Sequence, residues 1–178
     1  IAVGEYNSMY KVYRRLHGVS PVWDDITKNL PYAPKMVKYE PNEYSDSICY
    51  LGTTNGIYKT WDSDESNPPT NMWVARNYGL DELYITSLIV NPENLSVIYT
   101  TATDQDTENN AYISADSARS WILIDDGLPG TELYELAMDP DNPDSTYLGT
   151  ESGLYYYIDN VWSGSLPAGT TTTWGPGL

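Results

Sequence analysis

Carboxylates are the side chains of this sequence that could do chemistry, because other reactive types are scarce. The 178 residues include 25 Asp and Glu against 9 Lys and Arg, a formal net charge of −16. The single His argues against a Ser/His/Asp triad, and the single Cys excludes both an intrachain disulfide and a cysteine-based zinc site. The basic residues are scattered, so we expect no nucleic-acid binding, since phosphates would be repelled.

One polar stretch alternates hard oxygen ligands, Asp104-Gln105-Asp106-Thr107-Glu108. Carboxylates at Asp104, Asp106 and Glu108 are the ligand type that Ca²⁺ prefers. The stretch lacks the glycine and the distal Glu of an EF-hand loop, and Asp62-Ser63-Asp64 is a weaker candidate of the same kind. The sequence therefore suggests either no cofactor or a calcium ion.

Where these carboxylates lie depends on the fold, and an internal repeat indicates the fold. A Trp precedes a Leu by seven residues three times, and the pairs are Trp23/Leu30, Trp73/Leu80 and Trp121/Leu128. Tyr50, Tyr99 and Tyr147 keep the same period of 48 to 50 residues. Repeats of this length are typical of solenoids and propellers. No run approaches 18 apolar residues, so we expect no membrane span.

Each repeat holds four short strand-like pieces. In the copy over 83–130 the pieces are Tyr84 to Val90, Val97 to Ala102, Ala111 to Ser114 and Trp121 to Ile124. Pro and Gly fall in the turns between them, as sheet hydrogen bonding requires. Four antiparallel strands in such a repeat predict a β-propeller blade.

The chain is therefore predicted to be all-β, with about four blades near 1–32, 33–82, 83–130 and 131–178. The first blade lacks its innermost strand, and the last is predicted to end on a fourth strand at Trp174. Propellers have about 4–8 blades. We expect a piece of a larger propeller, completed by further blades or chains; a four-bladed ring with an unusual closure is the alternative.

At this point the residues resemble a known family. Ser114-Ala115-Asp116-Ser117-Ala118-Arg119-Ser120-Trp121 resembles the Asp-box of BNR repeats, Ser-x-Asp-x-Gly-x-Thr-Trp, with Ala118 in place of the glycine. The amino-acid sequences of the repeats are similar to those of sortilin-type, xyloglucanase-type and photosystem-assembly-type propellers. A second box opens at Asp62 and is interrupted before Trp73; another opens at Asp159. The resemblance implies a structural role for Ser114, Asp116, Trp121, Asp62 and Trp73.

In such a propeller, the ligand face is built from the loops between second and third strands and from the linkers between blades. Those segments gather a rim of carboxylates with tyrosines nearby. The predicted residues are Glu5, Asp81, Glu82, Tyr84, Asp104, Asp106, Glu108, Glu132, Tyr134 and Glu151, with Tyr6 close by. Three interpretations stay open: a solvated acidic rim, a calcium site, or a carbohydrate site with tyrosine faces on sugar rings.

Catalysis finds little support in these loops. A glycosidase needs two facing carboxylates. Xyloglucanase-type relatives carry an acidic residue in a loop reading Thr-Asp-Val-Gly-Gly, and the matching loops here are Thr53-Thr54-Asn55-Gly56 and Thr150-Glu151-Ser152-Gly153. Glu151 is thus the one weak catalytic candidate that the resemblance implies. The Arg residues do not fit the converging trio of a sialidase.

Our functional expectation is a non-catalytic, extracytoplasmic binding or assembly scaffold that recognises a protein or a polysaccharide. The alternatives are a segment of a glycoside hydrolase acting on a β-glucan, and a structural subunit of a surface layer or filament.

Overall fold

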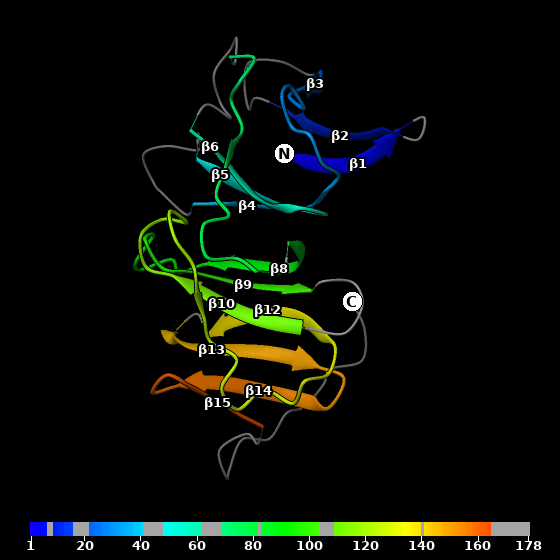
Figure 1. Ribbon diagram of the computed structural model, residues 1–178. Coiled ribbons are helices and arrows are strands. Elements are labelled where there is room, and N and C mark those ends of the chain that lie inside the picture. Colours follow the sequence, from blue (N-terminus) through cyan, green and yellow to red (C-terminus); the bar gives the residue numbers. More distant parts are fainter. Residues whose placement is uncertain are drawn as a thin grey trace.

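The computed structural model describes residues 1–6, 9–15, 22–40, 48–61, 69–81, 83–103, 109–139 and 141–164. These residues form fifteen β-strands in four antiparallel sheets, and none of them is helical. The sheets stack in chain order, from the blue N-terminal sheet to the orange C-terminal one (Figure 1). The predicted all-β propeller segment of four blades is confirmed, and we number the sheets blades 1 to 4. The described ranges include no helix long and apolar enough to cross a membrane.

The strands run in order across each blade. Blade 1 holds β1 (Ala2–Tyr6), β2 (Met9–Arg14) and β3 (Asp24–Asp25). Blade 2 holds β4 (Pro34–Tyr39), β5 (Cys49–Thr53), β6 (Gly56–Thr60) and β7 (Val74–Ala75). Blade 3 holds β8 (Tyr84–Val90), β9 (Ile98–Thr103), β10 (Asn109–Ser114) and β11 (Ile122–Leu123). Blade 4 holds β12 (Leu133–Asp139), β13 (Asn142–Thr150), β14 (Gly153–Ile158) and β15 (Val161–Ser163).

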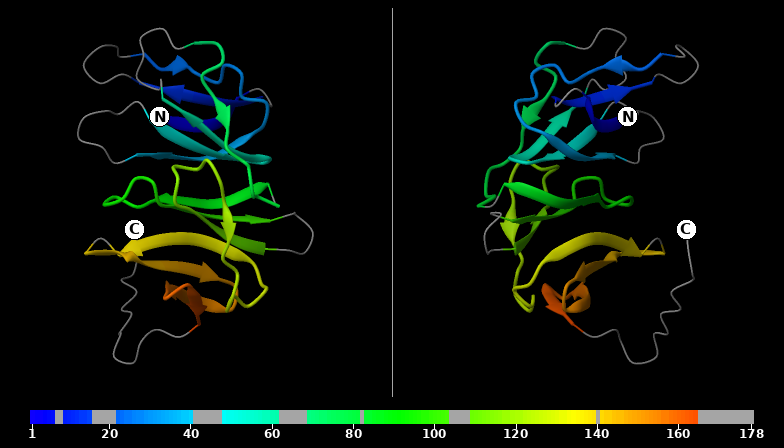
Figure 2. Two further views of the ribbon diagram at one scale, coloured as in Figure 1. Left: turned by 60° about the vertical axis from the view of Figure 1, so that its left-hand side comes forward. Right: turned by 90° about the vertical axis from the view of Figure 1, so that its right-hand side faces the viewer.

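Blade 1 has three strands, as predicted, because it lacks the strand that corresponds to β4, β8 and β12. Those three strands pack against one another from blade to blade. The views in Figure 2 show the same stacking of twisted sheets from two further sides. The first strands of blades 2, 3 and 4 therefore line one common region of the molecule.

The prediction for the last strand is wrong. The fourth strand of blade 4 is β15, which contains Trp162, and Trp174 lies outside the described residues. The cause is a two-residue turn at Asp159 and Asn160, whose φ angles are 51° and 65°. Positive φ at both central positions defines the tight hairpin turn that Asn and Asp tolerate best. The chain therefore folds back at once, without the long loop that the sequence had suggested.

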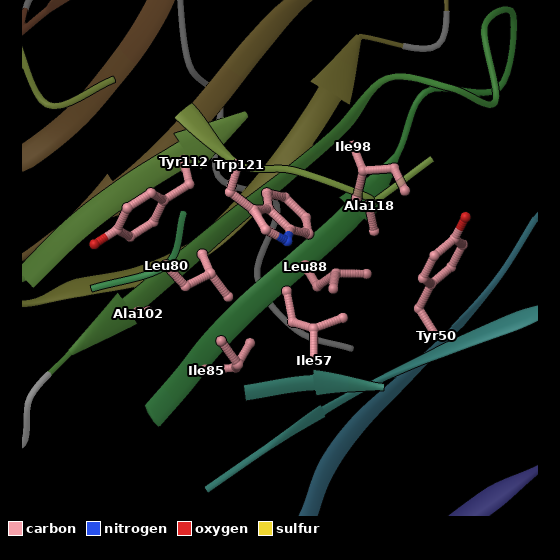
Figure 3. Close-up of a cluster of buried hydrophobic side chains, with 10 residues drawn as sticks. All are labelled: Tyr50, Ile57, Leu80, Ile85, Leu88, Ile98, Ala102, Tyr112, Ala118 and Trp121. Carbon is pink, nitrogen blue, oxygen red and sulfur yellow. The ribbon is translucent and has the colours of Figure 1, made fainter. Parts of the chain in front are cut away.

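The core lies between blades, in three apolar clusters. Figure 3 shows the middle one, where Tyr50 and Ile57 of blade 2 face Leu88, Ile98 and Trp121 of blade 3. Alternate residues of a strand point to opposite faces of its sheet, so a central strand can serve both neighbouring blades. All five residues of β5 are buried accordingly. Each blade buries its faces against the next, and burial of this apolar surface holds the stack together.

A tryptophan links each successive pair of blades. The indole N–H of Trp73 donates to the Ile26 carbonyl (2.9 Å), that of Trp121 to the Arg76 carbonyl (2.7 Å), and that of Trp162 to the Ile124 carbonyl (2.6 Å). The three indoles are 2%, 4% and 2% exposed. In every case, the acceptor belongs to the preceding blade. We call this contact the tryptophan latch.

The backbone of each latch tryptophan is held by a four-residue turn of the preceding blade. The amides of Trp121 and Trp162 donate to the carbonyls of Tyr78 (2.9 Å) and Asp126 (3.0 Å). The next residues, Gly79 and Gly127, have φ of 89° and 87°. A Cβ at either glycine would collide with the carbonyl oxygen of Trp121 or Trp162. Glycine is thus required there both by its backbone conformation and by the close approach.

The turn that receives Trp73 holds the tryptophan backbone through a side chain and not through a glycine. In the turn at residues 27–30, the positive φ (46°) is at Lys28, one residue earlier than in the two glycine turns. The side chain of Asn29 then takes over from the backbone: its Oδ1 accepts the Trp73 amide (3.0 Å) and its Nδ2 donates to the Trp73 carbonyl (2.8 Å). An asparagine side chain can replace the peptide group because it carries the same donor and acceptor.

The turn ahead of Trp121 is built on Asp116. Its Oδ1 accepts the amides of Arg119 and Ser120 (both 2.9 Å) and the Ser114 hydroxyl (2.9 Å), while its Oδ2 accepts the Ser120 hydroxyl (2.7 Å). Although burial raises the pKa of Asp116, the bonds from Ser120, Ser114 and Arg119 outweigh it and lower the pKa to about 2. Ala118 has a φ of 64° and is fully buried. The turn closes in spite of the missing glycine.

Candidate functional site

A concavity of about 1090 Å³ lies over the first strands of blades 2, 3 and 4. Its walls come from β4, β8 and β12, from the ends of β9 and β10, and from the turn between β13 and β14. The lining residues are Lys35, Met36, Tyr84, Ile85, Thr86, Thr103, Asn109, Gly130, Thr131, Glu132, Leu133, Tyr134, Glu135 and Glu151. Because it combines aromatic and polar side chains in a concave surface, this hollow is the candidate ligand site.

The wall formed by blades 2 and 3 carries the one cation of this lining. The Nζ of Lys35 lies 5.0 Å from the centroid of the Tyr84 ring. The hydrogen bond with the Tyr84 hydroxyl raises the pKa of Lys35, so the amine stays charged. The inner strands bring these residues together, since Lys35 is the second residue of β4 and Tyr84 the first residue of β8.

The acidic part of the lining comes from blade 4 and the linker into it. The amide of Glu151 donates to the carbonyl of Glu132 (3.0 Å), which places the two residues side by side. Tyr134 stands next to them with 51% of its surface exposed. Partial desolvation and the carboxylates of Glu132 and Glu151 raise the pKa of Tyr134, so its hydroxyl remains a donor at neutral pH.

The turn that presents Glu151 has a counterpart in blade 2. In blade 4, the Thr150 hydroxyl donates to the Gly153 carbonyl (3.0 Å) and accepts the Ser152 amide (3.1 Å). In blade 2, the Thr53 hydroxyl makes the same bonds to the Gly56 carbonyl (2.7 Å) and the Asn55 amide (3.1 Å). Glu151 therefore occupies the position of Thr54, which does not line the concavity.

Glu135 is anchored from the neighbouring blade. Its Oε1 accepts the Ser87 hydroxyl at 3.3 Å, and the same hydroxyl oxygen accepts the Leu136 amide at 3.0 Å. Ser87 is fully buried in β8. This bridge holds the beginning of β12 against blade 3, and so positions the acidic wall relative to the lysine.

This arrangement offers groups that can bind a ligand. Tyrosine rings offer flat apolar faces with a polar hydroxyl, and carboxylates accept hydrogen bonds from hydroxyls, amides or amines. Hydrolysis of a glycoside requires carboxylates on both sides of the scissile bond. Among the described lining residues, all three carboxylates come from blade 4 or the linker into it, and none faces them from blades 2 and 3.

The structure brings four predicted ligand-face residues together in the concavity: Tyr84, Glu132, Tyr134 and Glu151. Asp81 is exposed in the linker before β8 and does not line it. Glu82, Asp104, Asp106 and Glu108 lie outside the described residues, as do the side chains of Glu5 and Tyr6. The loop 104–108 begins and ends at lining residues, Thr103 and Asn109.

Lining residues that the sequence analysis did not single out include Lys35, Asn109 and Glu135. Lys35 carried a usable signal, because it is one of the first two residues of an inner strand, as Tyr84 and Tyr134 are. Applying the repeat to strand starts as well as to loops would have found it. No sequence signal pointed to Glu135, because its position depends on a hydrogen bond from Ser87 in another blade.

Calcium binding stays a prediction, because Asp104, Asp106, Glu108 and the weaker candidate Asp62 lie outside the described residues. Within the part of the chain that the structure describes, no group of three or more His, Cys, Asp or Glu side chains could hold a metal ion.

A second polar cluster lies at the other end of the blade 2 strands and is closed. Lys59 Nζ donates to Glu40 Oε1 (2.9 Å) and to the Tyr50 hydroxyl (2.6 Å), which in turn donates to Glu40 Oε1 (2.6 Å). Burial lowers the pKa of Lys59, although Glu40 opposes this effect, and burial also raises the pKa of Tyr50. All three side chains are nearly inaccessible. Their bonds satisfy one another, so the cluster is a structural tie within blade 2.

The chain resembles known proteins only among solved structures. No family model and no curated protein matches the chain. Among solved structures, an ancestral GH74 enzyme matches with a TM-score of 0.62 and 19% identity, over 79% of this chain and 19% of its own. The GH74 xyloglucanase from Xanthomonas campestris matches with a TM-score of 0.53 and 23% identity, over 71% of this chain and 20% of its own.

A third solved structure, YCF48 bound to D1 peptide, matches with a TM-score of 0.51 and 15% identity, over 80% of this chain and 42% of its own. The chain thus spans about a fifth of the two GH74 proteins and less than half of YCF48. At these identities the likeness concerns the fold alone, and the fold is that of a β-propeller segment.

Proposed function

We propose that this chain is a non-catalytic binding segment of a propeller, and that it holds a protein or polysaccharide ligand in the concavity over blades 2 to 4. The observation that carries the proposal is the described lining: blade 4 and the linker into it supply Glu132, Tyr134 and Glu151, and blades 2 and 3 supply Lys35 and Tyr84. Such walls can hold the hydroxyls of a sugar chain or the polar groups of a peptide, without a carboxylate pair across a bond.

The fold neighbours bear on both this binding proposal and its hydrolase alternative. Two are GH74 enzymes, one of them named as a xyloglucanase, and a third is a protein bound to a peptide. We further assign residues 114–121 to the Asp-box class of turn, on the bonds that Asp116 makes. As part of the same proposal, we place the protein outside the cytoplasm, as the resemblance of its repeats to the Asp-box family implies.

Binding to the concavity is tested with two immobilised panels, xyloglucan oligosaccharides and synthetic peptides, using the intact chain. We expect Glu132→Gln and Tyr134→Ala to weaken binding of whichever probe is retained by about 10- to 100-fold, since a charged hydrogen bond contributes about 1.5–3 kcal/mol. Thr54→Ala is the matched control, because Thr54 has the turn position of Glu151 outside the concavity. Equal binding by all variants would refute the proposal.

The second candidate is a segment of a glycoside hydrolase acting on a β-glucan. It is favoured by Glu151, which stands in the turn between the second and third strands of its blade and lines the concavity. Release of reducing ends from xyloglucan separates the two functions. The binding proposal predicts no turnover by the intact protein, whereas turnover that Glu151→Gln abolishes and Thr54→Ala leaves unchanged would establish the hydrolase.

A further inference from the structure

Two arginines of this acidic chain, Arg76 and Arg119, have no carboxylate partner among the described residues. The sequence holds 25 Asp and Glu against 9 Lys and Arg. Lys11, Arg14 and Lys59 each form an ion pair, whereas neither Arg76 nor Arg119 pairs with a residue that the structure describes. The Nε of Arg76 is also buried and has no hydrogen-bond partner. A donor left unsatisfied in this way is costly, so an anion bound from outside would be favoured here.

Trp61 is the platform on which these cations gather. The guanidinium carbon of Arg76 lies 5.0 Å from the centroid of the Trp61 ring, and the Nζ of Lys59 lies 5.2 Å from it. Trp61 directly follows β6 and is 41% exposed. Stacking on an indole holds a guanidinium in place while the N–H groups at its edge stay able to donate to a carboxylate.

Blade 3 brings the second guanidinium to the same place. The indole of Trp121 donates to the Arg76 carbonyl (2.7 Å), and Arg119 stands two residues before Trp121. Burial lowers the pKa of Lys59, and the charges of Arg76 and Arg119 lower it further, so both guanidiniums lie within electrostatic range of its amine. Arg119 is exposed and Arg76 is half-buried. We call Lys59, Trp61, Arg76 and Arg119 the seam cluster, because it joins blades 2 and 3.

The carboxylates that the structure places at this seam are already engaged. Glu40 accepts hydrogen bonds from Lys59 and from the Tyr50 hydroxyl. Asp116 accepts its four bonds from within its own turn, through backbone amides and serine hydroxyls. Neither is bonded to the guanidinium of Arg76 or Arg119. The seam cluster therefore presents free cationic groups on a chain whose net charge is −16.

We propose that the seam cluster is a second binding site, and that its ligand is an acidic segment of a partner protein whose Asp or Glu carboxylates are bound by Arg76 and Arg119 beside Trp61. Charge complementarity carries the argument, since arginine binds carboxylates through paired N–H donors. Two guanidiniums from different blades suit a segment with at least two carboxylates. The site is separate from the concavity, which lies at the other end of the blade 2 strands.

The surroundings of the seam cluster favour a protein segment over an acidic polysaccharide. Trp, Tyr and Arg are the residue types that contribute most of the binding energy in protein interfaces. Close to Arg76 in sequence, Val74 and Tyr78 are 40% and 81% exposed and can contact apolar side chains of a partner. A sugar would instead need an open aromatic face, and two cations already lie over the Trp61 ring.

The test measures binding of short fluorescein-labelled peptides, rich in Asp and Glu among Ser and Gly, to the intact chain by fluorescence anisotropy at low salt. Labelled oligogalacturonate carries the same carboxylate chemistry on a sugar chain. We expect the acidic peptides to bind, and Arg76→Gln and Arg119→Gln each to weaken them about 10-fold, as loss of a charged hydrogen bond predicts.

Arg15→Gln is the matched control, because it removes the same charge from an exposed arginine of blade 1. It should change the affinity by less than about twofold. Equal losses from all three substitutions would show that overall charge alone governs binding, and would overturn the proposal. Failure of the acidic peptides to bind, or binding of oligogalacturonate in their place, would overturn it as well.

Two further measurements guard against misfolding and self-association. Arg76→Lys keeps the charge, and the backbone carbonyl that Trp121 uses, but loses the planar guanidinium. We expect it to bind the peptides several-fold more weakly at an unchanged melting temperature, and full binding by this variant would overturn the paired recognition. Light scattering of the free chain is expected to give the same mass with and without Arg76→Gln. A dimer that this substitution dissociates would make a second copy the occupant and overturn the proposal.

Discussion

Blades 3 and 4 present their latch tryptophans by two unlike turns. In blade 3, residues 115–120 bridge β10 and Trp121, and Asp116 ties them with four hydrogen bonds. In blade 4, only Asp159 and Asn160 separate β14 from β15, and the turn works through positive φ at both. Both solutions deliver an indole that is buried and bonded to the preceding blade. The tryptophan latch is therefore present at every described interface between blades, whereas the turn ahead of the tryptophan can be built in different ways.

The replaceability of the turn has a simple physical basis. The indole contributes buried area and an interblade hydrogen bond, which join two sheets that have no covalent contact other than one linker. The turn only has to return the chain at the right strand position, and either polar bonds or tight backbone geometry can do so. Losses at the tryptophans should therefore exceed losses at the turns.

Replacement of the latch tryptophans should have the largest effect. We expect Trp121→Ala and Trp162→Ala each to lower the free energy of unfolding by about 3–5 kcal/mol, the usual cost of removing a buried large aromatic side chain. Urea denaturation followed by circular dichroism measures both. The two values should agree in spite of the different turns.

Trp23→Ala is the control for these two variants, since its indole is 50% exposed, and it should change stability by no more than about 0.5 kcal/mol. A markedly smaller loss at Trp162 than at Trp121 would mean that the short turn delivers a weaker latch.

Substitutions in the turn that receives a latch tryptophan should have the next largest effect on stability. Gly127→Ala should cost about 2–4 kcal/mol, because a left-handed backbone disfavours Ala and the methyl group meets the Trp162 carbonyl. Gly130→Ala separates the two causes. Gly130 also has a positive φ (65°), but no atom lies within 4 Å of a Cβ there, so it should cost only about 1–2 kcal/mol. Equal losses at the two glycines would rule out the close approach as a cause.

The contribution of the Asp116 turn to stability is expected to depend on pH. Asp116→Ala should lower stability at neutral pH by about 1.5–3 kcal/mol, through loss of charged hydrogen bonds. The folded pKa of about 2 is below the ordinary value of 3.8, so the carboxylate contributes its stability above that ordinary value. This contribution is lost as the pH falls toward 2.

The difference in melting temperature between the unmodified chain and Asp116→Ala should therefore shrink steadily between about pH 4 and pH 2. Thermal scans across this range measure it, and Asp159→Ala serves as the comparison in blade 4. A gap for Asp116→Ala that stays constant down to pH 2 would show that the carboxylate charge is not what holds the turn.

Much of the fold could be predicted because the latch leaves a periodic trace. The Trp-to-Leu spacing correctly located the outermost strands of blades 1, 2 and 3. The reason is that Leu30, Leu80 and Leu128 close the turns that receive the next tryptophan. It failed at Trp162, where no Leu follows at that distance. The signal that would have corrected it was the Asp159-Asn160 pair between two apolar runs, a pattern typical of a tight hairpin.

The candidate site was predictable only in part, for a different reason. Tyr84, Glu132, Tyr134 and Glu151 lie in loops or at strand starts that the repeat itself aligns, so one blade predicts the next. Glu135 is placed by a hydroxyl from another blade, at Ser87, and such a contact has no counterpart in the local pattern. Contacts between blades depend on how the sheets stack, and the sequence of a single repeat does not contain that information.

The smallest expected changes in stability come from glycine substitutions in the two turns, and they compare the turns most directly. Asn160→Gly should stabilise the chain by about 0.5–1 kcal/mol, because glycine adopts the positive φ (65°) without a steric cost and Asn160 is exposed. Ala118→Gly relieves the same kind of strain at a φ of 64°, but Ala118 is fully buried and would lose its packed methyl group. That loss is about 0.8 kcal/mol, so the two terms should nearly cancel.

Denaturation curves for both variants should therefore show a gain in blade 4 and little change in blade 3. The result turns on burial, because the two positions share a backbone conformation and differ in what surrounds the side chain. If Ala118→Gly stabilised the chain as much as Asn160→Gly, the alanine methyl would contribute nothing to the interface between blades 2 and 3. The glycine of the family pattern would then be better at this position, and its absence here would have to be attributed to something other than packing.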